Sequence, residues 1–232
     1  DLADDLDGTV WYGQRLFDIC PQRFIIKVPL TPAGYLAART LSIQGVRVNF
    51  TLGFSARQNY LAALLAEPSF VNVFLGRLNS FVAHNELGDG NNIGERTLVA
   101  SQEAVTEVRT ERDLSTQQIA ASMRVGHQVS ALAGVDVMTL PLGVAQAFVS
   151  SQIRPEELVP FTDQRYPVHL GGGVMREVIS ALWEVTRDFK DVSTALLNEP
   201  LDSYQPDDLR RFFAEHGMRD LFPAWSAEDN QT

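Results

Sequence analysis

The stretch Phe24-Ile25-Ile26-Lys27-Val28-Pro29-Leu30, followed by Thr31 and Pro32, decides how the chain is expected to fold. A short apolar run rich in β-formers predicts a buried strand. Threonine before proline is typical of a helix N-cap and first helical position, and Gly45 is expected to end that helix. A strand followed by a helix is one βα unit of a parallel sheet.

Four further βα units are expected along the next hundred residues. The second strand spans residues 46–52, and Ser55 with Gln58 predicts a capping box for a helix that ends at Ala66. The other strands share an apolar run that ends at turn residues; they are expected at 70–75, 117–123 and 135–140.

The segments after these strands are expected to differ in structure. A polar, glycine-rich loop is expected at 76–94, before a helix around 95–109, and short helices are expected to begin near Gly126 and Leu142. Beyond residue 150 the pattern becomes helical, with helices predicted at 174–197 and 206–216. We therefore expect two regions: 1–150 with five βα units, and 151–232 as a C-terminal helical extension that packs on them.

The composition restricts the class of protein. The chain has 232 residues, 45% of them hydrophobic, and a formal charge of -10. This charge repels phosphate backbones and anionic lipid, so nucleic-acid and membrane partners are not expected. The apolar stretch 129–149 contains Asp136 and Pro141, which predict a strand and a helix and not a membrane span. A single cysteine, Cys20, allows no internal disulfide and fits a reducing cytosol.

Lys27 is the first candidate for a catalytic residue. Only Lys27 and Lys190 are lysines, and the other 17 basic residues are arginines. The apolar run around Lys27 predicts burial on both faces of the strand, which would disfavour its charged form and make it a nucleophilic amine. The alternative is that Lys27 ends an edge strand or pairs with a buried carboxylate.

Alternation of side chains gives Lys27 polar neighbours on the next strand. There Asn49 and Thr51 share one face, whereas Val48 and Phe50 share the other. Inward polar residues of this kind could also simply hydrogen-bond to one another.

Two arginines follow the strands at their carboxyl ends, where barrel enzymes place their sites. Asn72 and Phe74 share a face and precede Arg77, and Ser122 shares parity with Arg124. A guanidinium is a planar donor that suits phosphate. Each arginine alone could instead form a surface ion pair.

The residues that carry these features resemble one family in five ordered motifs over about 130 residues. The motifs are IKVPLT at 26–31 with Gly34, VNFTLGFS at 48–55, FLGR at 74–77, ASMR at 121–124 and MTLP at 138–141. They resemble the transaldolases, whose lysine strand is the fourth of a (β/α)8 TIM barrel. The resemblance therefore implies that this chain holds strands 4–8, and that strands 1–3, with an aspartate, an asparagine with a threonine, and a proton-handling glutamate, are missing.

The resemblance also implies the roles of individual residues. Lys27 would form the Schiff base, and Asn49 and Thr51 would hydrogen-bond near it. Three residues would bind the substrate phosphate: Arg77, Ser122 and Arg124. Phe74 and Asn72 would make two further contacts to the substrate. Asn72 stands where many members of the family have serine, so its role is the least defined.

The function implied is transfer of a dihydroxyacetone unit from sedoheptulose 7-phosphate or fructose 6-phosphate to glyceraldehyde 3-phosphate or erythrose 4-phosphate, in the cytoplasm and the pentose phosphate pathway. No metal or organic cofactor is implied. The four histidines show no metal-ligand spacing, and His127, beside the phosphate motif, is expected to be a satisfied or solvent-facing residue. A homo-oligomer is compatible with the sequence, which does not fix the preferred donor and acceptor.

Two other interpretations stay open. One is a Schiff-base aldolase like fructose-6-phosphate aldolase, which would release free dihydroxyacetone. The other is a noncatalytic sugar-phosphate-binding remnant, because no proton-handling carboxylate is visible in the chain.

Overall fold

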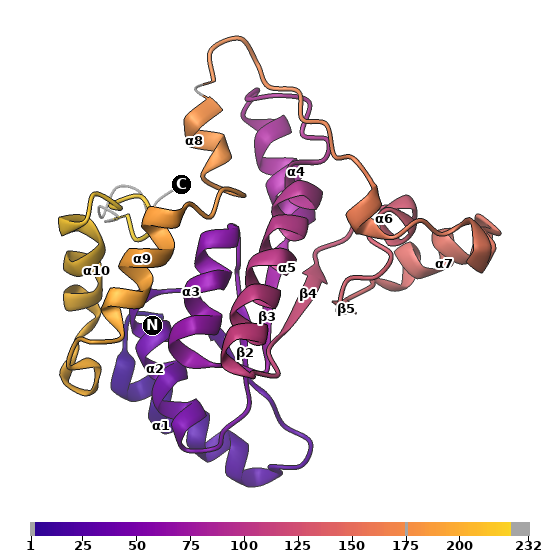
Figure 1. Ribbon diagram of the computed structural model, residues 1–232. Helices are drawn as coiled ribbons and strands as arrows, with labels where there is room; N and C mark the ends of the chain where they lie inside the picture. Colours follow the sequence, from indigo (N-terminus) through magenta and orange to yellow (C-terminus); the bar gives the residue numbers. More distant parts are fainter. Residues whose placement is uncertain (1–2, 175, 224–232) are drawn as a thin grey trace.

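Five parallel strands form the centre of the protein, whose computed structural model describes residues 3–174 and 176–223 (Figure 1). Their order in the sheet is their order in the chain: β1 (Ile26–Pro29), β2 (Val48–Thr51), β3 (Phe70–Phe74), β4 (Gln117–Ala121) and β5 (Val137–Met138). The α/β class and all five predicted strands are confirmed. Each strand is shorter than predicted by one to four residues, and β1, β2 and β5 lose residues at both ends.

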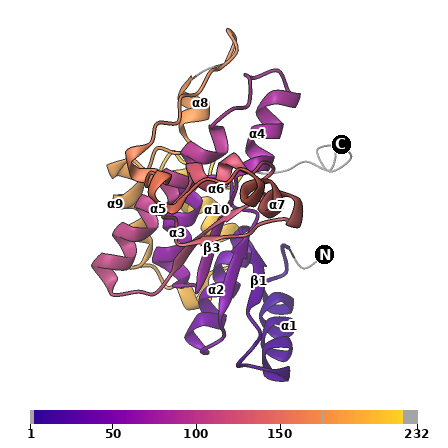
Figure 2. The ribbon, with the colours of Figure 1, turned by 90° about the vertical axis from the view of Figure 1, so that its right-hand side faces the viewer.

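Ten helices surround this sheet within the described residues. They are α1 (Leu6–Ile19), α2 (Pro32–Ile43), α3 (Ala56–Ala66), α4 (Leu75–His84), α5 (Ile93–Arg112), α6 (His127–Ala131), α7 (Leu142–Ser150), α8 (Arg176–Ser180), α9 (Arg187–Leu196) and α10 (Pro206–Glu215). Helices α2, α3 and α5 cover one face of the sheet, and α9 and α10 lie outside them (Figure 1). Helix α1 lies beside α2 at the β1 edge (Figure 2).

The predicted caps begin α2 and α3. Thr31 Oγ1 accepts from Gly34 N at 3.1 Å, and Ser55 Oγ accepts from Gln58 N at 3.2 Å. Gln58 Oε1 accepts in return from Ser55 N at 3.1 Å, which completes the capping box. The caps therefore fix the first residue of each of these two helices.

The prediction of one glycine-rich loop at 76–94 is wrong. Helix α4 occupies its first half, and Leu75, Leu78 and Val82 on one side of α4 are buried. This apolar spacing of three and four residues was present in the sequence, but Gly76 and the polar residues around it obscured it.

The prediction of one helix at 174–197 is also wrong. Helices α8 and α9 are separate, because Thr186 begins a new helix by accepting from Phe189 N at 3.2 Å. Phe189 and Phe213 of α10 enter the same core as Tyr60 and Phe50, and Phe161 and Ile179 enter a second core with Val73. The segment after residue 150 is thus part of both cores.

The expectation that the first strand is buried on both faces is wrong in this structure. Val28 has no exposed surface and Ile26 is 8% exposed, whereas Lys27 between them is exposed. Helix α2 packs against the strand on the Ile26 and Val28 side, so the Lys27 side faces outward. The burial that was expected to activate this lysine is not seen here. No helix within the described ranges is long and apolar enough to cross a membrane.

Candidate active site

Lys27 and Asn49 are register partners in neighbouring strands. The ladder between β1 and β2 pairs Lys27 with Asn49, and Pro29 with Thr51. Residues paired in this way point to the same side of a sheet. The predicted parity is confirmed on β2, because Val48 and Phe50 are fully buried while Asn49 and Thr51 remain partly exposed.

Phe74, at the end of β3, lies close to two cationic side chains. Lys27 Nζ is 6.0 Å from the centroid of the Phe74 ring, and Arg77 Cζ is 5.2 Å from the same centroid. Both distances allow attraction between a cation and the face of the ring. The structure therefore brings the candidate nucleophile and one candidate phosphate ligand close to the same aromatic ring.

Asn72 lies two residues before Phe74 in β3 and is only 2% exposed. Its Nδ2 atom donates to the carbonyl of Phe50 and lies 3.4 Å from Asn49 Oδ1, while Gly53 N donates to its Oδ1 atom at 3.5 Å. Asn59 Nδ2 donates to the backbone carbonyl of Asn72 at 3.0 Å. The Asn72 amide thus connects β3 to β2 directly beside Asn49.

The two arginines lie on neighbouring segments. Gly76 packs so closely on the segment after β4 that an added Cβ would lie 2.0 Å from the carbonyl oxygen of Ser122 and 2.8 Å from Arg124 Cγ. Arg77, one residue later, begins the exposed side of α4. Ser122 has φ of 64°, a left-handed conformation that is strained for serine and that recurs at functional sites.

Neither arginine forms the surface ion pair that was its alternative role. Across the described residues, no carboxylate pairs with Lys27, Arg77 or Arg124. Lys190 is different, since its Nζ lies 2.6 Å and 2.5 Å from the two oxygens of Glu107. Cationic side chains without acidic partners are available to an anionic ligand.

The sequence did not predict the buried polar residues that lie beside Arg124. Gln128 Oε1 accepts from Arg124 N at 2.7 Å, and Gln128 Nε2 donates to Glu95 at 2.6 Å. Burial, and then the Glu95 carboxylate, raise the pKa of Tyr166 to about 12. A signal existed for Gln128, because a glutamine four residues after Arg124 can reach the turn between strand and helix. Glu95 had no comparable signal.

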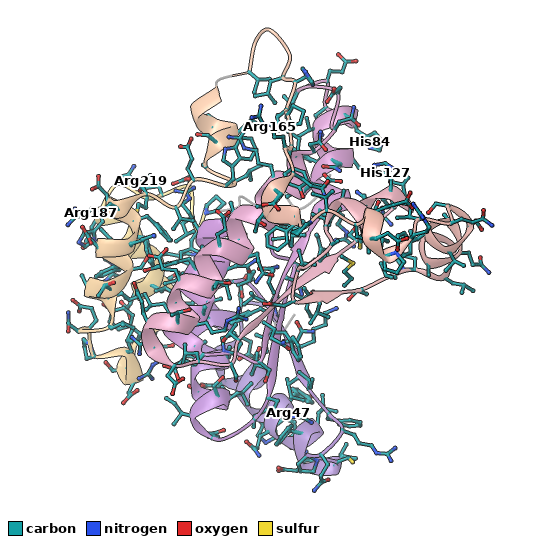
Figure 3. All side chains as sticks on the ribbon, turned by 45° about the vertical axis from the view of Figure 1, so that its right-hand side comes forward. Arg47, His84, His127, Arg165, Arg187 and Arg219 are labelled. Carbon is teal, nitrogen blue, oxygen red and sulfur yellow. The ribbon has the colours of Figure 1, made fainter. Side chains whose placement is uncertain are left out.

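Two of the four histidines lie at helix ends near the candidate site. His84 ends α4 and His127 begins α6, at the same end of the molecule, and both are exposed (Figure 3). Within the part of the chain that the structure describes, no three histidine, cysteine, aspartate or glutamate side chains are grouped to hold a metal ion.

Comparison with known proteins gives a consistent result. The chain matches the family model described as transaldolase/fructose-6-phosphate aldolase over residues 1–211. It is 34% identical over 162 residues to a probable transaldolase of Exiguobacterium sibiricum, covering 69% of this chain and 68% of that protein. It is 34% identical over 165 residues to a probable transaldolase of Hyphomonas neptunium, covering 69% and 68%. A probable transaldolase of Thermus thermophilus is 37% identical over 144 residues, covering 61% and 58%.

Proposed function

The chain belongs to the transaldolase/fructose-6-phosphate aldolase family, and from this premise we propose that it acts in a transaldolase with Lys27 as the Schiff-base nucleophile. The proposal rests chiefly on one observation. Lys27 projects from the middle of β1 toward Asn49 and Phe74 with no carboxylate partner among the described residues, whereas the other lysine is paired with Glu107. An unpaired amine beside polar amides can attack a carbonyl carbon.

The reaction proceeds in two halves. The Lys27 amine adds to the C2 ketone of a ketose phosphate and loses water, which forms an iminium ion. The C3–C4 bond then breaks, its electron pair moves into the iminium to give an enamine, and the C4 hydroxyl proton passes to a base as the aldose phosphate leaves. The enamine attacks the aldehyde of the acceptor, and hydrolysis frees Lys27.

The surrounding residues have separate roles in this proposal. Asn49 and Thr51 hydrogen-bond to the hydroxyls of the dihydroxyacetone unit, and Arg77, Ser122 and Arg124 bind the phosphate. Asn72 acts through Asn49, because its own amide is buried and bonded to β2.

The barrel and the biological setting belong to the same proposal. The five strands correspond in this proposal to strands 4–8 of a (β/α)8 barrel, with residues 151–232 as a helical extension. Sedoheptulose 7-phosphate and fructose 6-phosphate are the donors, and glyceraldehyde 3-phosphate and erythrose 4-phosphate are the acceptors, in the cytoplasmic pentose phosphate pathway.

Reductive trapping tests the nucleophile. Sodium borohydride added with fructose 6-phosphate should fix a carbon adduct on Lys27, located by peptide mass spectrometry. Lys27→Met should abolish the adduct, and Lys190→Met, the matched control, should leave it unchanged. An adduct on Lys190, or none in a preparation that carries out transfer, contradicts the assignment.

A further inference from the structure

A buried carboxylate lies behind Arg124. Glu95, in the first turn of α5, is 4% exposed. Its Oε1 atom accepts from Gln128 Nε2 at 2.6 Å, and its Oε2 atom accepts from Asn79 Nδ2 at 2.9 Å. The carboxylate therefore joins α4, α5 and α6 at one point.

Each of the two amides has its orientation fixed by a second partner. Asn79 Oδ1 accepts from Gly94 N at 2.7 Å, so the Asn79 nitrogen must face Glu95. Gln128 Oε1 accepts from Arg124 N at 2.7 Å and from Val125 N at 3.2 Å, so the Gln128 nitrogen must face Glu95 as well. Two converging donors require a group that only accepts, which a carboxylate is and a carboxamide is not.

This requirement is costly for the fold. No lysine, arginine or histidine in the described ranges forms an ion pair with Glu95, whose carboxylate, in the first turn of α5, accepts from the Gln128 and Asn79 amides. A buried carboxylate without a cation is expensive even when it is hydrogen-bonded. Packing alone does not explain why a carboxylate occupies this buried position.

The hydrogen bonds lead to the backbone that carries Arg124. Strand β4 ends at Ala121 and α6 begins at His127, so Arg124 lies in the connection between them. The Arg124 and Val125 N–H groups in this connection both donate to Gln128, whose position depends on Glu95.

We propose that Glu95 is a positioning residue that fixes the Arg124 backbone through Gln128 and so aims the guanidinium at the substrate phosphate. This extends the proposed function, since it assumes that Arg124 binds phosphate. The hydrogen-bonded unit of Glu95, Gln128, Asn79 and the Arg124–Val125 backbone is called the carboxylate clamp below.

Exchanging the two polar groups tests the clamp without changing its size. In Glu95→Gln alone, the new amide nitrogen faces the Gln128 nitrogen, so two donors meet. In Gln128→Glu alone, the new carboxylate faces the Glu95 carboxylate, so two acceptors meet. In the double variant the amide at position 95 can donate to the carboxylate at position 128 and still accept from Asn79, while that carboxylate accepts from Arg124 N. Glu103→Gln, at an exposed position of the same helix, is the matched control.

Two measurements on the full chain separate the clamp from the phosphate site. Hydrogen exchange at the Arg124 and Val125 amides should become about tenfold faster in each single variant, and the affinity for inorganic phosphate should fall about tenfold, with both restored in the double variant. The control should change neither.

The outcomes distinguish the two proposals. If Arg124→Ala leaves phosphate affinity unchanged, the phosphate site fails, and hydrogen exchange still decides whether the clamp exists. If Arg124→Ala weakens phosphate binding but Glu95→Gln changes neither measurement, the positioning role is overturned. Failure of the double variant to recover either measurement overturns it too, because a merely structural requirement for the native pair would give that result.

Discussion

The Lys27 ammonium nitrogen lies 6.0 Å from the centroid of the Phe74 ring, two strands away across the sheet. An intermediate attached to Lys27 would therefore meet an apolar ring that can neither donate a proton nor hold a water molecule through a polar group. Such a neighbour should prolong the life of an enamine until an acceptor arrives, which favours transfer over release.

Phe74→Tyr should raise the release of free dihydroxyacetone relative to transfer, because a phenol can position water or donate a proton at the enamine carbon. The ratio of free dihydroxyacetone to transfer product, measured with fructose 6-phosphate with and without erythrose 4-phosphate, checks this. Phe81→Tyr, at a position that is 60% exposed, is the control. An unchanged ratio in a Phe74 variant that still forms the Lys27 adduct would show that the ring only fills space.

Arg77→Ala or Arg124→Ala should weaken the apparent affinity for phosphorylated donors about tenfold, because each loses a charge-assisted contact. Transfer from unphosphorylated sugars should change little. Arg187→Ala is the matched control, since this arginine pairs with Asp191 on the surface of α9 (Figure 3). Equal losses for both kinds of substrate would argue against phosphate binding.

Asn72→Ala should lower both stability and turnover, because it leaves the Phe50 carbonyl and Gly53 N–H without their side-chain partner beside Asn49. A loss of about 1–3 kcal/mol in the free energy of unfolding is expected for buried groups left unpaired. Asn85→Ala removes only an exposed bond to Phe81 O and should cost much less. Denaturant unfolding of both variants makes the comparison, and similar losses would contradict it.

Two glycine substitutions should have opposite effects on stability. An added Cβ on Gly53 would lie 1.9 Å from the Asn72 carbonyl oxygen, so Gly53→Ala must displace strand backbone and should destabilise by about 1–3 kcal/mol or more. Gly143, within α7, has no atom within 4 Å of an added Cβ, so Gly143→Ala should stabilise by roughly 0.4–1 kcal/mol. Thermal unfolding would give the signs, and a shift of the same sign in both would refute the packing argument.

The sequence predicted the features that depend on local chemistry. Thr31 and Ser55 cap helices as expected, and the alternation on β2 places Val48 and Phe50 in the core. It did not predict the exposure of Lys27, because a buried and a half-covered strand can share the same apolar run, and only the packing of α2 on one side decides between them. The role of Glu95 could not be predicted for a related reason. Its partners Asn79 and Gln128 are 16 and 33 residues away in the chain, so no local pattern connects them.

The ion pair between Lys190 and Glu107 has a practical consequence for chemical modification of the protein. The chain has only two lysines, and one of them is half-buried and bonded to both oxygens of a carboxylate, so amine-directed dyes, resins and crosslinkers will meet Lys27 as the more exposed lysine side chain. Routine conjugation through lysine would therefore block the very group proposed to do the chemistry. Tethering through Cys20, the single thiol, leaves that group free and gives one defined point of attachment.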